Sequence, residues 1–281
     1  MTMLHGKFIL MAGLALLAVS CSDNDTTVDD NDRSHPSTND TKVIAHRGYW
    51  NAPETKGAQN SIASLKAAQD FGAYGAEFDV NMTADDKLVV LHGPSHKGIS
   101  NVQTADFEQV RAKTLENGEP TPTLAEYLEQ GAKNKGTKLI LEIKNHATDA
   151  RETQVVEAVI DEVESAGMKE QVEYIAFSLH VCKEIVRLDP EAKVAYLNGD
   201  LSPAELKELG ITGLDYQKAK MTANPSWLRD ARALGITVNV WTINNADDMQ
   251  WAVNKGVDYI TTDYPDQVQA VIDAKNAAIK K

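Results

Sequence analysis

Two short segments of this 281-residue sequence place carboxylates on apolar β-strands. Glu77 and Asp79 lie two residues apart in GAEFDVNM, and Glu142 and Lys144 repeat this spacing in LILEIKNH. Successive side chains of a strand point to opposite faces, so each pair shares one face. Three carboxylates brought together need a cation between them or sharply raised pKa values. Because an all-oxygen ligand set favours a hard ion, these residues predict a site for Ca²⁺ or Mg²⁺.

The elements that must position these residues alternate between strands and helices from residue 43 onward. Strands are predicted at 43–46, 76–82 with a companion at 88–92, 138–144, 174–178, 194–197, 214–217, 237–243 and 259–262. Helices are predicted near 61–72, 123–135, 151–167, 180–188, 203–209, 225–234, 246–254 and 265–279. Eight such alternations over residues 41–281 predict one α/β domain, a single (β/α)8 TIM barrel. No glycine-rich phosphate loop follows the first strand, which disfavours an open doubly wound sheet.

Polar residues recur where the predicted strands end. In a TIM barrel the carboxyl ends of the strands gather around one mouth, where active sites are built. The residues at these ends are His46, Arg47, Glu77, Asp79, His92, Glu142, Lys144, Ser178, Gln217, Trp241 and Asp263. Taken alone, a Glu-x-Asp pair also fits a salt-bridged rim, and His46 also fits a hydrogen-bonded core histidine. Their occurrence on successive strand ends favours a catalytic site.

Six ordered segments extend from residue 43 toward the C-terminus: VIAHRGYW, AEFDVNMTADDKLVVLHG, TPTLAEYL, LILEIK, VNVWTINN and GVDYITTDYPD. Together they resemble the glycerophosphodiester phosphodiesterases. The resemblance implies a TIM barrel with an insertion after the second strand unit, which fits the long irregular segment 93–122. It also implies three sets of site residues: divalent-cation ligands at Glu77, Asp79 and Glu142, catalytic histidines at His46 and His92, and cationic groups near the phosphate at Arg47 and Lys144.

Two positions depart from the pattern of that family. Gln59, in AQNS, stands where the family usually has Glu, and it can hydrogen-bond Arg47 or a metal-bound water with weaker electrostatic attraction. Gly93 follows His92 where the family usually has Asp, so an acid that orients this histidine is missing. His96, in HGPSHKG, is expected to be a solvated loop residue. These departures predict an altered substrate range.

The chemistry of a phosphodiester sets the roles of the remaining residues. The anion resists nucleophiles, so hydrolysis needs charge neutralisation, positioning and proton transfer. One of His46 and His92 accepts a proton and the other donates one, and the sequence leaves the assignment open. Trp241 is expected to form an apolar wall for the glycerol or the head group, and packing inside the barrel is an equal alternative.

The leading functional prediction is metal-dependent hydrolysis of glycerophosphodiesters, the deacylated head groups of phospholipids, to glycerol 3-phosphate and an alcohol. One alternative is a phospholipase-like or glycan phosphodiesterase barrel, although the mostly polar segment 93–122 provides no apolar lid. Another alternative is a lipoprotein that binds phosphorylated ligands with low turnover. The expected partner is a small-molecule phosphodiester, and the oligomeric state is left open.

The first forty residues predict export and anchoring. Residues 1–20 combine Lys7, an apolar run and small residues ahead of Cys21, which is typical of a lipoprotein-type signal peptide with lipidation at Cys21. A plain cleaved signal is the alternative. Residues 21–40 carry six aspartates and almost nothing apolar, so they predict a disordered acidic tether. We therefore expect a protein of the cell envelope, lipid-anchored to the outer membrane and either periplasmic or surface-exposed.

The charge of the chain narrows its partners further. The formal net charge is −13, and residues 41–281 carry −9 of it after the signal (+1) and the tether (−5) are subtracted. Nucleic acids and anionic membrane surfaces attract proteins with excess Lys and Arg, so this surface disfavours both as partners. Contact with a membrane is expected only through the lipid anchor.

Overall fold

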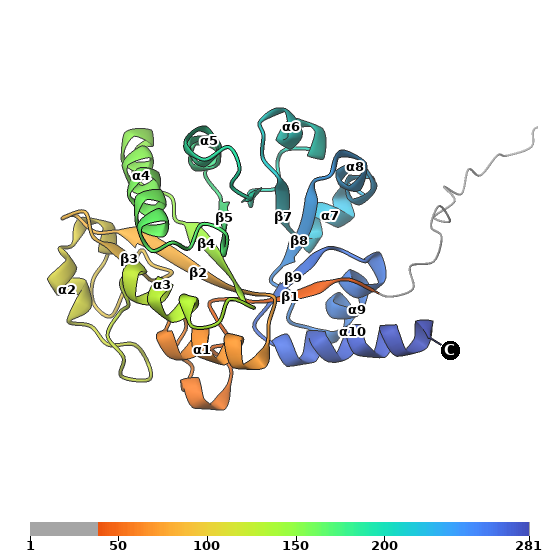
Figure 1. Cartoon of the computed structure of the whole chain (residues 1–281), viewed down its shortest axis with the longest axis horizontal. Helices are drawn as coiled ribbons and strands as arrows, with labels where there is room; N and C mark the ends of the chain where they lie inside the picture. The colour runs from red at the N-terminus through yellow and green to blue at the C-terminus, as the bar shows by residue number, and fades with distance from the viewer. Residues whose placement is uncertain (1–38, 281) are drawn as a thin grey trace, which may run out of the picture. The chain divides into compact units, whose positions relative to one another are not determined.

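The computed structural model describes residues 39–280, and a closed barrel of eight parallel strands forms its centre (Figure 1). The barrel strands are β1 (Lys42–Ala45), β2 (Gly75–Met82), β4 (Lys138–Ile143), β5 (Val172–Ala176), β6 (Val194–Tyr196), β7 (Gly213–Gln217), β8 (Thr237–Trp241) and β9 (Tyr259–Thr262). Neighbouring strands pair in parallel in this order, and β1 pairs with both β9 and β2, which closes the barrel. The predicted α/β fold, a (β/α)8 TIM barrel, is confirmed.

Helices connect the barrel strands and surround them (Figure 1). They are α1 (Ile62–Phe71), α3 (Leu124–Ala132), α4 (Asp149–Ser165), α5 (Leu179–Leu188), α6 (Pro203–Glu208), α7 (Lys218–Ala223), α8 (Trp227–Leu234), α9 (Ala246–Lys255) and α10 (Pro265–Ile279). All eight predicted helices are present with ends shifted by a few residues. The short helix α7, which follows β7 directly, was not predicted.

Side chains alternate along each strand between the barrel interior and the layer beneath the helices. On β2, Phe78 and Val80 belong to the core under the helices, and Phe78 stacks on Tyr127 of α3 with ring centroids 4.2 Å apart. A second apolar cluster fills the interior and contains Ile44, Ile140, Ile175 and Leu197. Since Phe78 and Val80 face outward, Glu77 and Asp79 face inward.

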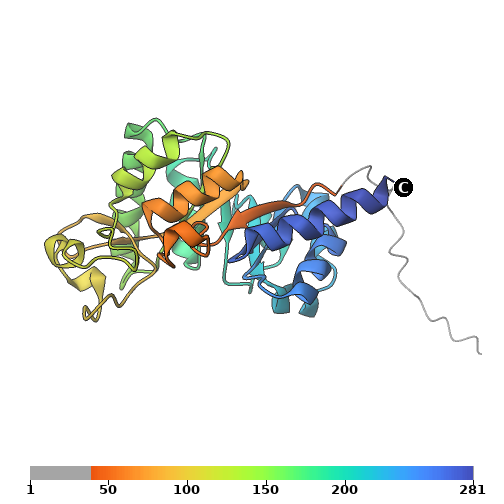
Figure 2. The ribbon, with the colours of Figure 1, turned by 90° about the horizontal axis from the view of Figure 1, so that it is seen from below.

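The predicted insertion after the second strand unit is present. It begins with β3 (Leu88–Val90), which pairs antiparallel with the end of β2, and continues through the 3-10 helix η2 (Val102–Thr104) and α2 (Phe107–Arg111). The insertion has its own apolar cluster, formed by Val89, Leu91, Val102, Ala105 and Val110. In both views the segment around α2 lies at the far end of the folded unit from α10 (Figures 1 and 2).

Hydrogen bonds fix the insertion to the barrel. The side chain of Gln103 donates to Asn81 Oδ1 at 2.8 Å, and Asn81 Nδ2 in turn donates to the carbonyl of Leu91 at 2.6 Å. Asn81 is buried near the end of β2, so this amide pair holds the chain immediately before His92 in a defined place.

The expectation that His96 is a solvated loop residue was wrong. His96 is 8% exposed, and its Nε2 lies 3.3 Å from the hydroxyl of Thr121, which is fully buried. The polar neighbours of His96 in the sequence suggested solvent, but the insertion folds back on itself and encloses this ring. His96 therefore supports the insertion.

The described residues begin at Asn39, close to where β1 starts. Asn39 Nδ2 donates to the carbonyl of Val253 at the end of α9, and Asn276 of α10 donates to the carbonyl of Asn39. The predicted signal peptide, Cys21 and most of the predicted tether lie outside the described residues. Within residues 39–280, no helix combines the length and apolar character that crossing a membrane requires.

Candidate active site

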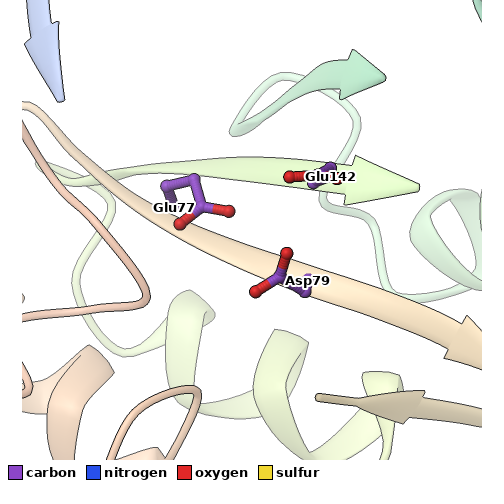
Figure 3. Close-up of side chains that lie close together, drawn as sticks. All are labelled: Glu77, Asp79 and Glu142. Carbon is purple, nitrogen blue, oxygen red and sulfur yellow. The ribbon is translucent and has the colours of Figure 1, made fainter. Parts of the chain in front are cut away.

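Three carboxyl groups from the neighbouring strands β2 and β4 converge (Figure 3). Asp79 and Glu142 are paired in the register of the two strands, and Glu77 lies two residues before Asp79 on the same face. One oxygen from each carboxyl group lies within 4.8 Å of the others. Glu77, Asp79 and Glu142 are only 3%, 1% and 7% exposed, so the predicted convergence occurs inside the protein.

Two cationic side chains flank this carboxylate trio. Lys144 Nζ lies 2.6 Å from Glu142 Oε1 and 3.2 Å from Asp79 Oδ1. The guanidinium of Arg47 lies farther away, with Nε 3.8 Å from Asp79 Oδ2. The backbone of Arg47 has a left-handed φ of 56°, and its N–H donates to Glu77 Oε2 at 2.7 Å. The turn after β1 therefore brings both a backbone donor and a charged side chain to the trio.

The three carboxylates differ in their proton affinity. Burial, followed by the charges of Asp79 and Glu142, raises the pKa of Glu77 well above its ordinary value. Burial and Asp79 likewise raise the pKa of Glu142 to about 7, although Lys144 opposes the shift. For Asp79 burial alone would raise the pKa, but Lys144 and other favourable neighbours outweigh it and lower the pKa.

The donor set fits a divalent cation. The trio supplies three oxygen ligands within reach of one another, and hard ions such as Ca²⁺ and Mg²⁺ prefer carboxylate oxygens. Burial, together with the charge of the neighbouring carboxylates, raises the pKa values of Glu77 and Glu142, and a bound cation would favour their ionised forms. The trio is therefore a candidate divalent-cation site.

His46 follows β1 directly and is held by the other end of the chain. Its backbone N–H donates to the carbonyl of Thr262 at 2.9 Å, and its Nδ1 lies 2.7 Å from Asp263 Oδ1. The sequence placed Asp263 at a strand end but gave it no role. Because 217 residues separate His46 from Asp263, only the closure of the barrel reveals this pair.

His92 lies just beyond the end of β3, with part of its side chain in solvent and part covered by the protein. Desolvation of its ring lowers the pKa of His92. The positive charge of Arg47 adds to this shift, and the negative charge of Asp79 opposes it.

Gln59 contacts Arg47, since its Oε1 accepts a hydrogen bond from Arg47 Nη1 at 2.7 Å. Of the two partners suggested for Gln59, Arg47 or a metal-bound water, the structure shows the hydrogen bond with Arg47.

Asn60 is a site residue that the sequence analysis missed. It is 1% exposed, its Nδ2 donates to Asp79 Oδ2 at 2.8 Å, and its Oδ1 accepts from the backbone N–H of Asp79 at 3.1 Å. A left-handed φ of 56° at Asn60 turns its side chain toward the trio. The available signal was its position directly after Gln59 in a segment already assigned to the site.

Trp241 ends β8 and is half-buried at the mouth of the barrel. Its Nε1 donates to the carbonyl of Asp215 at 2.7 Å, and its ring meets Phe177 edge to face with centroids 5.5 Å apart. These contacts fix the ring as a rigid apolar surface, which is compatible with both readings of this residue. Contact with substrate stays a prediction.

A TIM barrel with a candidate divalent-cation site beside cationic and imidazole groups is suited to hydrolysing phosphate esters, because such groups can neutralise the charge of an anionic substrate and transfer protons. Residues 46–267 match the glycerophosphoryl diester phosphodiesterase family. The chain belongs to this family and is a phosphoric diester hydrolase. The resemblance found in the sequence is thereby confirmed.

Individual relatives agree with this assignment. The sequence is 28% identical over 240 residues to a glycerophosphodiester phosphodiesterase of Caldanaerobacter subterraneus subsp. tengcongensis, and this match covers 80% of this chain and 95% of that protein. The crystal structure of a glycerophosphodiester phosphodiesterase from Parabacteroides distasonis matches with a TM-score of 0.82 and 43% identity, over 84% of this chain and 98% of that one. An Oleispira antarctica phosphodiesterase, solved with its product sn-glycerol-3-phosphate, shares the fold with a TM-score of 0.72 at 22% identity, over 83% and 96%.

Proposed function

We propose that this protein hydrolyses glycerophosphodiesters to glycerol 3-phosphate and an alcohol, with one divalent cation, Ca²⁺ or Mg²⁺, bound by Glu77, Asp79 and Glu142. The observation that carries the proposal is the convergence of these three buried carboxylates within 4.8 Å of one another beside Lys144. Membership of the family supports the substrate class.

Charge neutralisation is assigned to the groups around the trio. A bound divalent cation supplies Lewis acidity toward a phosphoryl oxygen. Arg47 and Lys144 place two positive charges beside Asp79, and both attract the phosphate anion of the substrate. The guanidinium of Arg47 is suited to two oxygens at once, and a hydrogen bond to Gln59 helps to hold it.

Proton transfer is assigned to the two histidines. The lowered pKa of His92 keeps its ring neutral at pH 7, which is the form that accepts a proton from the attacking hydroxyl group. His46 then donates a proton to the leaving alcohol as the phosphorus–oxygen bond breaks. Because p-nitrophenol leaves without a proton, replacing His46 is expected to cost far less activity on a p-nitrophenyl ester than on glycerophosphocholine.

One assay tests the proposal and separates its alternatives. The protein without residues 1–21 is incubated with glycerophosphocholine, glycerophosphoethanolamine, glycerophosphoinositol or a lysophospholipid, with Ca²⁺, Mg²⁺ or a chelator, and the released alcohol is quantified. We expect turnover of the deacylated substrates that the chelator abolishes and that Glu77→Gln and His46→Ala eliminate. Glu129→Gln, on the exposed face of α3, is the matched control and should retain full activity.

The remaining outcomes of this assay contradict the proposal. Preferential release from the lysophospholipid identifies a phospholipase-like enzyme. Binding of glycerophosphodiesters without turnover identifies a ligand-binding lipoprotein. Turnover that survives the chelator refutes the role of the cation.

We also propose that Cys21 is lipidated and that the protein is anchored in the cell envelope at the outer membrane. The lipoprotein-type signal of residues 1–20 supports this location. Growth with a radiolabelled fatty acid should label the wild-type protein and leave Cys21→Ser unlabelled. Equal labelling of both proteins, or of neither, would contradict the anchor.

A further inference from the structure

Asp263 directly follows β9 and is surrounded by nitrogen donors. His46 Nδ1 lies 2.7 Å from its Oδ1, the indole nitrogen of Trp50 donates to the same oxygen at 2.9 Å, and Asn244 Nδ2 donates to Oδ2 at 2.6 Å. The three partners come from the turn after β1 and from the segment after β8. Both oxygens of this carboxylate are therefore engaged.

The orientation of the Asn244 amide is fixed independently. Its Oδ1 accepts hydrogen bonds from the backbone N–H of Asp263 at 2.9 Å and from the hydroxyl of Thr262 at 3.2 Å. Its Nδ2 must therefore be the group that meets Asp263 Oδ2. Burial would raise the pKa of Asp263, but the hydrogen bonds from His46, Trp50 and Asn244 outweigh burial and lower the pKa. Asp263 is thus an ionised acceptor at neutral pH.

This environment determines which nitrogen of His46 donates to Asp263. An ionised carboxylate can only accept, so His46 Nδ1 must be the donor. Nε2 is then the nitrogen left to exchange a proton with the substrate. The side chains of His46 and Asp263 are 19% and 17% exposed, and pairing of β1 with β9 places Ala45 beside Thr262, immediately before these two residues. The ring is therefore held by both its backbone and its side chain.

His92 is supported differently. The residue after it is Gly93, and the segment before it is held through a hydrogen bond to the carbonyl of Leu91. Among the described residues, the Asp263 pair is the one ion pair between a carboxylate and either of the two proposed catalytic histidines. Asp263 is thus the carboxylate that orients the His46 ring, in addition to the backbone contact of His46 with Thr262.

We infer that Asp263 is a positioning residue for His46. It holds the ring with Nδ1–H directed at its carboxylate, so that Nε2 is the nitrogen from which the protonated ring delivers a proton to the leaving alcohol. Trp50 and Asn244 hold Asp263 in place. This inference rests on the proposed catalytic role of His46. A carboxylate that orients a catalytic histidine through Nδ1 is worth up to roughly 10⁴-fold in kcat where its amide replacement has been measured in a serine protease.

The test compares Asp263→Asn with the wild type, both saturated with divalent cation, on glycerophosphocholine. We expect kcat to fall roughly 100-fold or more while KM changes less than about threefold, because an amide cannot accept from all three donors and releases the ring. Asp149→Asn is the matched control, since Asp149 also lies beside a histidine, His180, at 3.9 Å, but on the exposed start of α4. It should retain wild-type kcat.

A double variant separates positioning from a general structural role. On a p-nitrophenyl ester, where His46→Ala should retain measurable activity, adding Asp263→Asn to His46→Ala should change kcat by less than about twofold. A further tenfold loss in the double variant, or wild-type kcat in Asp263→Asn, would overturn the inference. If Asp263→Asn does not fold, Trp50→Phe provides a second test, because it removes one donor to Asp263 and should lower kcat several-fold. An unchanged kcat in Trp50→Phe would contradict the inference.

These results are distinguishable from failure of the proposed function. If the wild type does not turn over glycerophosphocholine, the proposed function fails before any variant is compared. If the wild type is active and His46→Ala is inactive while Asp263→Asn is fully active, only the inference about Asp263 fails.

Discussion

Buried carboxylates occur on two sides of the barrel interior, and their surroundings differ. On β2 and β4, Glu77, Asp79 and Glu142 lie beside Lys144, Arg47 and Asn60. On β7, Asp215 is 1% exposed, and its Oδ1 has no hydrogen-bond partner among the described residues. The neighbouring amide, Asn239 of β8, donates from Nδ2 to the hydroxyl of Thr261 on β9 at 2.8 Å.

The same degree of burial therefore has opposite consequences. Burial raises the pKa of Asp215 to about 8, so this side chain is mostly protonated at pH 7. Asp79 is equally buried, but its cationic and amide neighbours lower its pKa, so it stays ionised. The comparison teaches that burial does not make a carboxylate a cation ligand. Nearby positive charge and hydrogen-bond donors keep Asp79 ionised, and its convergence with two other carboxylates makes it a candidate cation ligand.

The largest effect is expected from Glu77→Gln, which removes one charge from the trio. Loss of a ligand should lower kcat/KM roughly 1,000-fold or more and weaken divalent-cation binding by calorimetry. Relief of like-charge repulsion should at the same time raise the melting temperature of the cation-free protein. An unchanged affinity for the cation would show that the trio is not its site, and Glu129→Gln again serves as the control.

Lys144→Met keeps the volume of the side chain and removes its charge. We expect kcat/KM to fall roughly 100-fold, since one group that stabilises the phosphoryl charge is lost. The affinity for the divalent cation should rise several-fold, because the positive charge of Lys144 no longer repels the cation beside the trio. Lys138→Met, at the opposite end of the same strand, is the matched control. A parallel loss of cation affinity in Lys144→Met would contradict our account of the trio.

Asp215→Asn tests the other side of the comparison through stability. The pKa of Asp215 is about 8 in the folded protein against an ordinary 3.8, so unfolding releases a proton between these values and stability falls as pH rises through that window. From pH 5 to pH 9, denaturant unfolding of the cation-free wild type should lose at least about 2 kcal/mol more than the variant. An equal loss in both proteins would assign the pH dependence to other groups.

The smallest effect is expected from Gln59→Glu, which adds a charge beside Arg47 on the catalytic side. The Arg47 pair becomes charge-assisted, and the added negative charge should raise the affinity for the divalent cation two- to threefold or so, with kcat changed less than about threefold. Gln154→Glu offers a matched control, because Gln154 also accepts from an arginine, Arg151, but on the exposed face of α4. A gain of similar size in the control would identify a nonspecific charge effect.

Much of the catalytic side could be predicted because strand periodicity is visible in one short segment. The two-residue spacing of Glu77 and Asp79 requires a shared face, and the same spacing applies to Glu142 and Lys144. The pairing of Asp79 with Glu142 depends on how β2 and β4 align, which no local pattern specifies. Convergence was therefore a hypothesis that only the assembled barrel could settle.

The parts that escaped prediction depend on tertiary structure. Asn60 reaches Asp79 through a left-handed turn that the strand pattern does not encode. The pair of His46 and Asp263 joins the first and last strands of the barrel. His96 is buried by packing within the insertion although its sequence neighbours are polar. The burial of Asp215 was likewise not predicted, since β7 has the pattern of an ordinary strand with one acidic residue.

The contacts of Asn39 have a practical consequence. They fix the incoming chain against α9 and α10, at the end of the barrel where the strands begin. Several of the proposed site residues, such as His46 and Lys144, instead follow the ends where the strands finish. A support attached ahead of residue 39 is therefore expected to lie next to the end of the barrel where the strands begin. Immobilising the protein on beads through its N-terminus should leave the entrance facing the solution and preserve turnover of soluble substrates.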